Sequence, residues 1–361
     1  MKTGKRRLAA FAVVAATMLL ALVGVVTPAW AEGESTDPQL PVTGGEVTIT
    51  STLTMDKNAV VPNADFKYTI APAEASGVTN TGMPATPGVK DAVSLSPSSV
   101  NYFAEALHSE DNADGVAKTI PAQMSVSLYT SKFTAPGIYR YKITQTPPQL
   151  DGLNVTYNEL FLDVYVENAE NGSSDYVVRG CTLSVKAGSG DKTSGFENKY
   201  VTHKLTIEKV VDGNQGDKNK GFDFTVTIKG ADGETYKYAT TTTPNELEAK
   251  SGTAIRVSLK NGESVIFYGL SSKDTFTVTE ENYSNDGYKT SYKIGDDTSS
   301  KEANSITEKE IGDFDTTVTF TNTKDVTVPT DVIRTVAPYV AIVAFAAVMG
   351  VVFFRPRRNR R

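Results

Sequence analysis

The chain has 361 residues, with 36 basic and 42 acidic side chains and a formal net charge of −6. This acidic balance argues against nucleic acid or anionic lipid as a partner, because both carry negative charge themselves. The one cysteine excludes an internal disulfide bond, and the two histidines lack the spacing of a metal site or a catalytic triad, so no metal and no cofactor are expected.

Residues 1–31 predict a secretory signal peptide. Four basic residues precede an apolar stretch at 8–26, and Ala29-Trp30-Ala31 has the small-x-small pattern of a cleavage site. The mature chain is therefore expected to begin at Glu32. Without those four positive charges, and without the net +5 of residues 331–361, the body at 32–330 has a net charge of −15.

The mature body predicts an all-β protein. Residues 32–43 are polar, include two prolines and predict a disordered lead-in. Short segments rich in Thr, Val, Ile, Tyr and Phe follow, separated by Gly, Asn, Asp and Pro, which is typical of antiparallel β-sandwiches. The body is long enough for two domains, and we expect immunoglobulin-like sandwiches at residues 44–199 and 200–325.

An internal repeat supports two copies of one fold. In each half a first, a second, a late and a last strand are expected in the same order. The matching segments are Val47–Thr50 with Leu205–Ile207, Pro62–Ile70 with Gly221–Ile228, Gly137–Gln145 with Asp274–Glu280, and Gly195–Asn198 with Thr319–Asn322.

Three polar residues of the second half are predicted to face the core. Strand side chains alternate between two faces, so every second residue shares a face. An amine, a carboxyl group and a carboxamide are thereby expected in apolar surroundings. Lys209 shares its face with Leu205, Ile207 and Val211, Glu280 with Phe276 and Val278, and Asn322 with Val318 and Phe320.

These three residues favour a reaction within the chain. Burial lowers the pKa of an amine and raises that of a carboxyl group, so that both approach their neutral forms. A neutral amine is a nucleophile, and a protonated carboxyl group can transfer protons. We expect Lys209 to attack Asn322, ammonia to leave and an isopeptide bond to form, with Glu280 as the acid–base group. The alternative is a buried ion pair of Lys209 and Glu280 capped by Asn322, but three such residues in register favour the crosslink.

The first half differs at two of these positions. The same count places Ser51 at the lysine position and Gln145 at the glutamate position, whereas Asn198 is retained. With neither amine nor acid, the isopeptide chemistry cannot run, and Lys57, expected beyond the end of the strand, is a poor substitute. An ester between Ser51 and Asn198 is an alternative, but a neutral hydrogen-bonded Ser–Gln–Asn cluster is favoured.

Residues 326–361 have three consecutive parts. The motif Thr327-Val328-Pro329-Thr330-Asp331 comes first, and residues 335–354 follow as 20 residues without a charge. That length can cross a bilayer as one helix, and the five arginines within 355–361 keep the end of the chain in the cytoplasm. A permanent anchor that is never cut is the alternative to a processed tail.

This tail resembles a Gram-positive cell-wall sorting signal. In such signals a sortase cuts after the threonine of Leu-Pro-x-Thr-Gly, or of the related Val-Pro-Thr-Gly form, and passes the acyl group to an amine. The resemblance implies recognition of Val328, Pro329, Thr330 and Asp331 and cleavage after Thr330. Asp331 stands where glycine is usual, which leaves the identity of the sortase open.

The body resembles the streptococcal major, or backbone, pilins of the FctA type. Lys209 after Leu-Thr-Ile, Glu280 in Val-Thr-Glu and Asn322 in Phe-Thr-Asn are similar to the self-crosslinking pattern of their CnaB-like domains. The resemblance runs from Val47 into the tail, and it is looser in the first half.

The resemblance implies a secreted structural subunit of a cell-wall pilus, or fimbrium, and not an enzyme. A pilus-class sortase would join Thr330 of one copy to a lysine of the next, and the nearest match is Lys192, with Lys186 and Lys199 as rivals. Other implied partners are accessory pilins and peptidoglycan, and the membrane holds only the precursor. The alternative is a wall-anchored adhesin or tip subunit, whereas no catalytic constellation supports an anchored enzyme.

Overall fold

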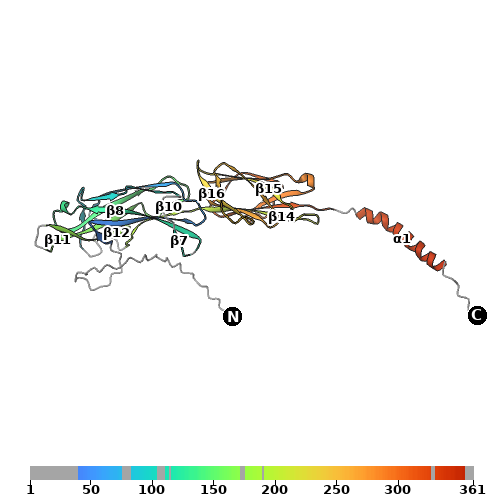
Figure 1. Cartoon of the computed structure of the whole chain (residues 1–361), viewed down its shortest axis with the longest axis horizontal. Coiled ribbons are helices and arrows are strands. Elements are labelled where there is room, and N and C mark those ends of the chain that lie inside the picture. Colours follow the sequence, from blue (N-terminus) through green and yellow to red (C-terminus); the bar gives the residue numbers. More distant parts are fainter. Residues whose placement is uncertain are drawn as a thin grey trace, which may run out of the picture. The chain divides into compact units, whose positions relative to one another are not determined.

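The structure is a computed structural model that describes residues 40–74, 83–103, 110–113, 115–170, 175–188, 191–326 and 330–353. Its strands form four sheets, which pack as two sandwiches (Figure 1). The predicted signal peptide, most of the predicted lead-in, Val328, Pro329 and the basic tail lie outside the described residues. The predicted division into two domains stays a prediction.

The first sandwich buries a core shared by two sheets, because alternate residues of its strands are apolar; in β2 every second side chain from Val47 on is buried. One sheet has the order β10 (Leu153–Val155), β13 (Gly195–Tyr200), β2 (Glu46–Asp56), β8 (Ala117–Leu128) and β5 (Val93–Ser96), with β1 (Val42–Thr43) on β2 and β7 (Glu110–Asp111) on β8. The other has the order β12 (Tyr176–Ser184), β11 (Glu159–Asn168), β9 (Gly137–Thr146), β3 (Ala64–Pro72) and β6 (Ser99–Tyr102), with β4 (Thr86–Pro87) on β9. A short helical turn, η1 (Thr130–Lys132), follows β8.

The second sandwich has its own apolar core. One sheet has the order β17 (Leu247–Lys250), β16 (Thr235–Thr240), β19 (Ser264–Leu270), β14 (His203–Asp212), β23 (Thr316–Thr323) and β21 (Lys289–Ile294). The other has the order β18 (Ala254–Leu259), β15 (Phe222–Lys229), β20 (Thr275–Glu280) and β22 (Ser305–Glu310), and η2 (Ser284–Asp286) follows β20.

The two sandwiches share a feature that positions the site. In each, the long first strand pairs in parallel with the last strand, β2 with β13 and β14 with β23. The second and late strands pair in the opposite sheet, β3 with β9 and β15 with β20. The expected order of first, second, late and last strand is therefore present in both halves.

The end of the predicted lead-in differs from the expectation. Leu40 forms a bridge with Cys181 on β12, and residues 42–43 form β1 against β2. The reason is apolar burial, since the Leu40 side chain belongs to the core of the first sandwich. Disorder is therefore wrong for residues 40–43.

An ion pair that the sequence did not indicate lies on the outer face of β9 and β11. Arg140 and Asp163 face each other across these strands, and both are buried. The guanidinium group binds the carboxylate with two hydrogen bonds, Nε to Oδ1 at 2.7 Å and Nη2 to Oδ2 at 2.8 Å. Both charges remain paired, which a buried arginine requires.

The C-terminal helix α1 (Thr330–Phe353) begins within the predicted sorting motif and includes most of the predicted span at 335–354. Its side chains are described for residues 338–349. Among the described residues, no helix has the length and hydrophobicity needed to span a membrane.

Candidate functional site

The second sandwich brings Lys209, Glu280 and Asn322 together from three strands. Lys209 of β14 lies opposite Phe320 of β23, so that Asn322 is two residues further along the same face. Glu280 ends β20 in the facing sheet and pairs with Phe224. All three side chains have an exposed fraction of 0%, so their polar groups cannot be solvated by bulk water.

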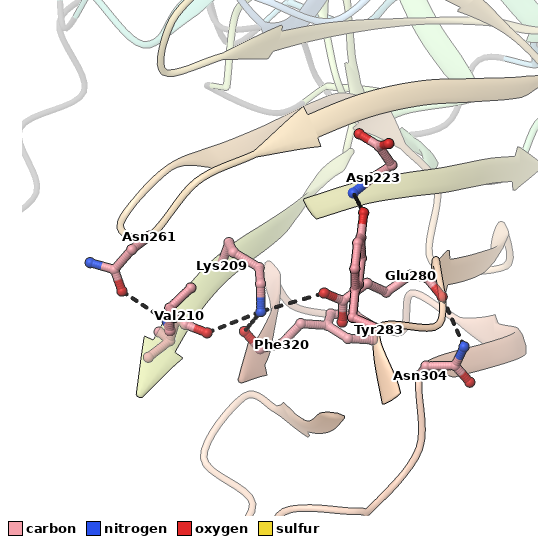
Figure 2. A network of polar contacts seen from close by, with 9 residues as sticks. Lys209, Val210, Asp223, Asn261, Glu280, Tyr283, Asn304 and Phe320 are labelled. Carbon is pink, nitrogen blue, oxygen red and sulfur yellow. Dashed lines mark hydrogen bonds and ion pairs between the residues drawn. The ribbon is translucent and has the colours of Figure 1, made fainter. Parts of the chain in front are cut away.

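The amine of Lys209 has three oxygen neighbours (Figure 2). It donates hydrogen bonds to the main-chain carbonyls of Val210 at 3.0 Å and Phe320 at 3.2 Å. The third neighbour is Glu280 Oε1 at 3.5 Å, which is within reach of an ion pair but long for a hydrogen bond. A neutral amine has two N–H donors and one lone pair, so the two carbonyls can take both donors and leave the lone pair available.

Burial brings the pKa values of the amine and the acid close together. Desolvation lowers the pKa of Lys209 to about 8, and the nearby Glu280 opposes this shift. Desolvation raises the pKa of Glu280 to about 7, opposed by Lys209 and Asn322. Because a pKa unit corresponds to about 1.4 kcal/mol, transfer of the proton from the ammonium to the carboxylate costs little here. Desolvation therefore shifts both groups toward their neutral forms.

Four polar atoms of this cluster have no hydrogen-bond partner among the described residues. They are both carboxylate oxygens of Glu280 and both polar atoms of the Asn322 carboxamide. Each such buried group costs about 1–3 kcal/mol relative to a bonded one. A folded protein seldom leaves four unbonded polar atoms side by side, which singles this cluster out.

The surroundings fix the carboxyl group and exclude water. The main chain of Glu280 is held by Asn304, whose carbonyl accepts from its N–H and whose side chain donates to its carbonyl, both at 2.8 Å. The ring of Phe222 lies 4.5 Å from the Lys209 amine. This apolar ring closes one side of the cluster, which keeps the local dielectric low.

The corresponding cluster of the first sandwich is neutral and fully hydrogen-bonded. Ser51 of β2 lies opposite Phe196 of β13, two residues before Asn198, and Gln145 of β9 lies opposite Tyr68 of β3. The carboxamides of Gln145 and Asn198 exchange two hydrogen bonds, at 2.9 and 3.1 Å. The Ser51 hydroxyl bonds instead to Tyr68, at 2.7 Å, and to Tyr102, at 2.8 Å.

The hydroxyl groups of Tyr102, Ser51 and Tyr68 can donate their hydrogen bonds in only one consistent order. Tyr68 donates to Gln145 Oε1 at 3.0 Å, so its single proton is used there. Ser51 must then donate to Tyr68, and Tyr102 to Ser51. Burial raises the pKa of Tyr68 and raises that of Tyr102 to about 12, so both hydroxyls stay neutral at ordinary pH.

The two tyrosines are the part of this cluster that sequence reasoning missed. One signal was present, because Phe66-Lys67-Tyr68 stands where the second half has Phe222-Asp223-Phe224. The added hydroxyl of Tyr68 lies next to the position where the amine is missing. Lys57 is not part of the cluster, since it follows β2 and pairs with Asp111 at 2.6 Å.

The three candidate acceptor lysines lie near the end of the first sandwich. Lys192 is half-buried and forms a bridge with Ser184 beside β12, three residues before β13 begins. Lys186 is exposed after β12, and Lys199 is exposed on β13. Cys181 is buried on β12, and desolvation raises the pKa of its thiol, as expected of a structural residue.

Comparison with known proteins reverses one expectation, because the isopeptide-domain family model matches the first half, where the resemblance was expected to be looser, and not the half that contains Lys209, Glu280 and Asn322. Residues 47–201 match the family model of the Spy0128-like isopeptide containing domain, and residues 203–324 match a domain of unknown function. A pilin of Streptococcus pyogenes serotype M1 is 31% identical over 332 residues, which cover 88% of this chain and 92% of that protein. The crystal structure of a major pilin from Streptococcus pyogenes covers 79% of this chain and 100% of its own, with 26% identity and a TM-score of 0.54. The pilus tip adhesin Cpa of Streptococcus pyogenes is 38% identical over 130 residues, 36% of this chain and 18% of the adhesin.

Proposed function

Because this chain belongs to the streptococcal pilin family, we propose that it is the backbone subunit of a covalently polymerised pilus on a Gram-positive cell. Members of this family are structural subunits, and no family of enzymes is indicated. Two covalent bonds define the proposal. One is formed by the second sandwich on itself, and the other joins successive copies of the chain.

The first bond links Lys209 to Asn322. The buried pair starts as a neutral amine and a protonated acid. Lys209 attacks the side-chain carbonyl carbon of Asn322 while Glu280 donates its proton to the carbonyl oxygen. Glu280, now ionised, accepts the proton that the attacking amine gives up and passes it to the carboxamide nitrogen. The carbonyl then re-forms and returns its proton to Glu280, the carbon–nitrogen bond breaks, and ammonia leaves. An amide remains between the two side chains, and Glu280 ends in its starting protonation state, which is why one carboxyl group is sufficient.

The observation that carries this bond is the set of four unbonded polar atoms on Glu280 and Asn322. In a lasting ion pair, the second carboxylate oxygen and the carboxamide would need hydrogen bonds of their own. In the crosslinked product the amide N–H replaces the ammonium group, and a protonated Glu280 can donate to the new carbonyl. The product therefore removes unpaired polar groups that the ion pair retains.

The second bond joins Thr330 of one copy to Lys192 of the next through a pilus-class sortase. Its support is the sorting motif followed by an uncharged stretch and a basic tail, together with the family. The signal peptide, the transient membrane stage and attachment to peptidoglycan belong to this proposal. Asp331 in place of glycine leaves the choice of sortase open.

Immunoblotting of cell-wall extracts in hot SDS tests the polymer. The native strain should give a ladder of regularly spaced heavy bands, and Lys192→Ala should collapse it to single subunits. Lys186→Ala and Lys199→Ala are the matched controls and should leave the ladder intact. Loss of the ladder in one of these controls, with Lys192→Ala unaffected, would assign the acceptor to that lysine.

A tip or accessory subunit is the second candidate, favoured by the partial match to the tip adhesin. Such a subunit would be anchored or attached singly. It predicts one anchored band in the native strain, where the backbone subunit predicts a ladder.

A further inference from the structure

The end of the second sandwich holds the segment that leads to the sorting motif. The regular parallel pairing of β14 with β23 ends where Asp212 lies opposite Thr323. Beyond this point the loop after β14 still contacts residues 324–326, which follow β23 and lead to the sorting motif. Lys324 N–H donates to Asp212 O at 3.1 Å, and Gln215 N–H donates to Lys324 O at 3.0 Å.

Asn214 extends this contact with its side chain. Its Oδ1 accepts from the N–H of Val326 at 2.9 Å, and its Nδ2 donates to the Val326 carbonyl at 3.2 Å. A carboxamide has the donor and acceptor of a peptide group, so Asn214 takes the place of a further strand residue. The main-chain N–H of Asn214 also donates to Asp325 Oδ1 at 2.9 Å.

Gly213 makes this close approach possible. Its φ of +89° is strained for other residues, and a Cβ there would lie 2.3 Å from the carbonyl oxygen of Lys324. A side chain at this position would push the loop away from the segment that leads to the sorting motif. Gly213 thus allows the loop to lie close to residues 324–326, and Asn214 makes hydrogen bonds to them.

We propose that Asn214 is a positioning residue that clips residues 324–326 to the second sandwich and so sets the length of the joint between successive subunits. The inference rests on the proposed covalent fibre. With the clip closed, four residues, 327–330, connect the folded body to the new bond, a reach of about 14 Å. Without the Asn214 side chain, Val326 is released while the main-chain bonds of Lys324 remain, so five residues, 326–330, do so and the reach rises to about 17 Å. A short joint restricts how far one subunit can tilt against the next.

The clip is tested first in the full-length precursor kept in detergent, by hydrogen exchange of the Val326 amide. Asn214→Ala should accelerate exchange of this amide about tenfold, the effect of losing one hydrogen bond of ordinary strength. Asn219→Ala is the matched control, because this exposed asparagine is in the same loop and its main-chain N–H bonds only to Asp217. Equal exchange in all three proteins would overturn the clip.

The consequence for the joint is tested on fibres isolated from cells and imaged by electron microscopy. Asn214→Ala fibres should bend more easily and have a shorter persistence length than native or Asn219→Ala fibres, because the connecting segment is longer. The melting temperature of the subunit should stay unchanged, which separates positioning from general stability. Faster exchange with unchanged bending would overturn the positioning role. A native strain without any ladder would overturn the fibre and the joint together, while the exchange experiment would still report on the clip.

Discussion

Ser51 in the first sandwich occupies the same strand position as Lys209 in the second. Each lies on the long first strand and opposite a phenylalanine of the last strand. In both cases that phenylalanine is followed two residues later by an asparagine, Asn198 or Asn322. The two sites therefore differ in chemistry and not in architecture. Where the lysine is absent, hydroxyls and carboxamides fill the space and satisfy one another.

The mass of the intact protein should reveal one crosslink. We expect the folded chain to be lighter than its sequence by the mass of one ammonia molecule, because only one cluster has an amine and an acid. Lys209→Ala and Asn322→Ala should restore the full mass, whereas Asn198→Ala should leave the loss unchanged. Two losses in the native chain would contradict the neutral state of the first cluster, and none would contradict the reaction of Lys209.

The crosslink should raise the stability of the second sandwich only. It closes a loop of roughly 110 residues, which the chain-entropy model values at about 4–5 kcal/mol. Calorimetry of the native protein should show two transitions, with the first sandwich unfolding at the lower temperature. In Asn322→Ala the upper transition should fall by on the order of 15 °C, while the lower one stays in place. A shift of the lower transition would mean that the two sandwiches do not unfold independently.

The rate of bond formation should depend on pH in a bell-shaped manner. Attack needs a neutral Lys209, and proton donation needs a protonated Glu280. Since their pKa values lie near 8 and 7, protonation of the amine slows the reaction as pH falls, and ionisation of the acid slows it as pH rises. The maximum is expected between pH 7 and 8. Refolding of denatured, unreacted chains at a series of pH values, followed by mass spectrometry, measures this rate, and a flat profile would remove Glu280 from the mechanism.

The neutral network of the first sandwich should be sensitive to the loss of one hydroxyl. Tyr68→Phe leaves the proton of Ser51 and one acceptor site of Gln145 without a partner, which should cost about 1–3 kcal/mol. Tyr129→Phe is the matched control, because the exposed Tyr129 hydroxyl bonds only to Ser94 among the described residues, and its loss should cost under about 0.5 kcal/mol. Urea unfolding of the first sandwich distinguishes these outcomes. Equal costs would show that the buried chain of hydroxyls contributes nothing beyond a surface contact.

Local sequence patterns predicted the burial of the Lys209 cluster because strand alternation is itself local. Counting by two along three segments was enough to place Lys209, Glu280 and Asn322 on inward faces, where the structure has them. The Ser51 cluster was only half predicted. Tyr102 lies on β6, a short strand in a segment without clear periodicity, and its contact with Ser51 depends on how distant strands are packed.

The burial of Arg140 and Asp163 on the outer face of the first sandwich could not be predicted from strand alternation. Arg140 and Asp163 alternate with core residues, so the pattern indicates exposed charges. They are buried as a pair, with two hydrogen bonds between the guanidinium group and the carboxylate. Which residues of two strands face each other depends on the register of the sheet, which is a long-range property, and the same holds for the bridge of Leu40 to β12.

In the proposed fibre, the position of Lys192 just before β13 would decide which sandwich must resist tension. In a fibre linked from Thr330 to Lys192, a pull enters the chain at Lys192, runs along β13 and passes directly into β14. Almost all of the first sandwich lies off this route, so the missing crosslink there does not weaken the fibre. The route then reaches Lys209, where the proposed bond carries the pull across to Asn322 and out to Thr330. In the proposed fibre, the amine and the acid therefore stand in the one sandwich whose mechanical strength would depend on them.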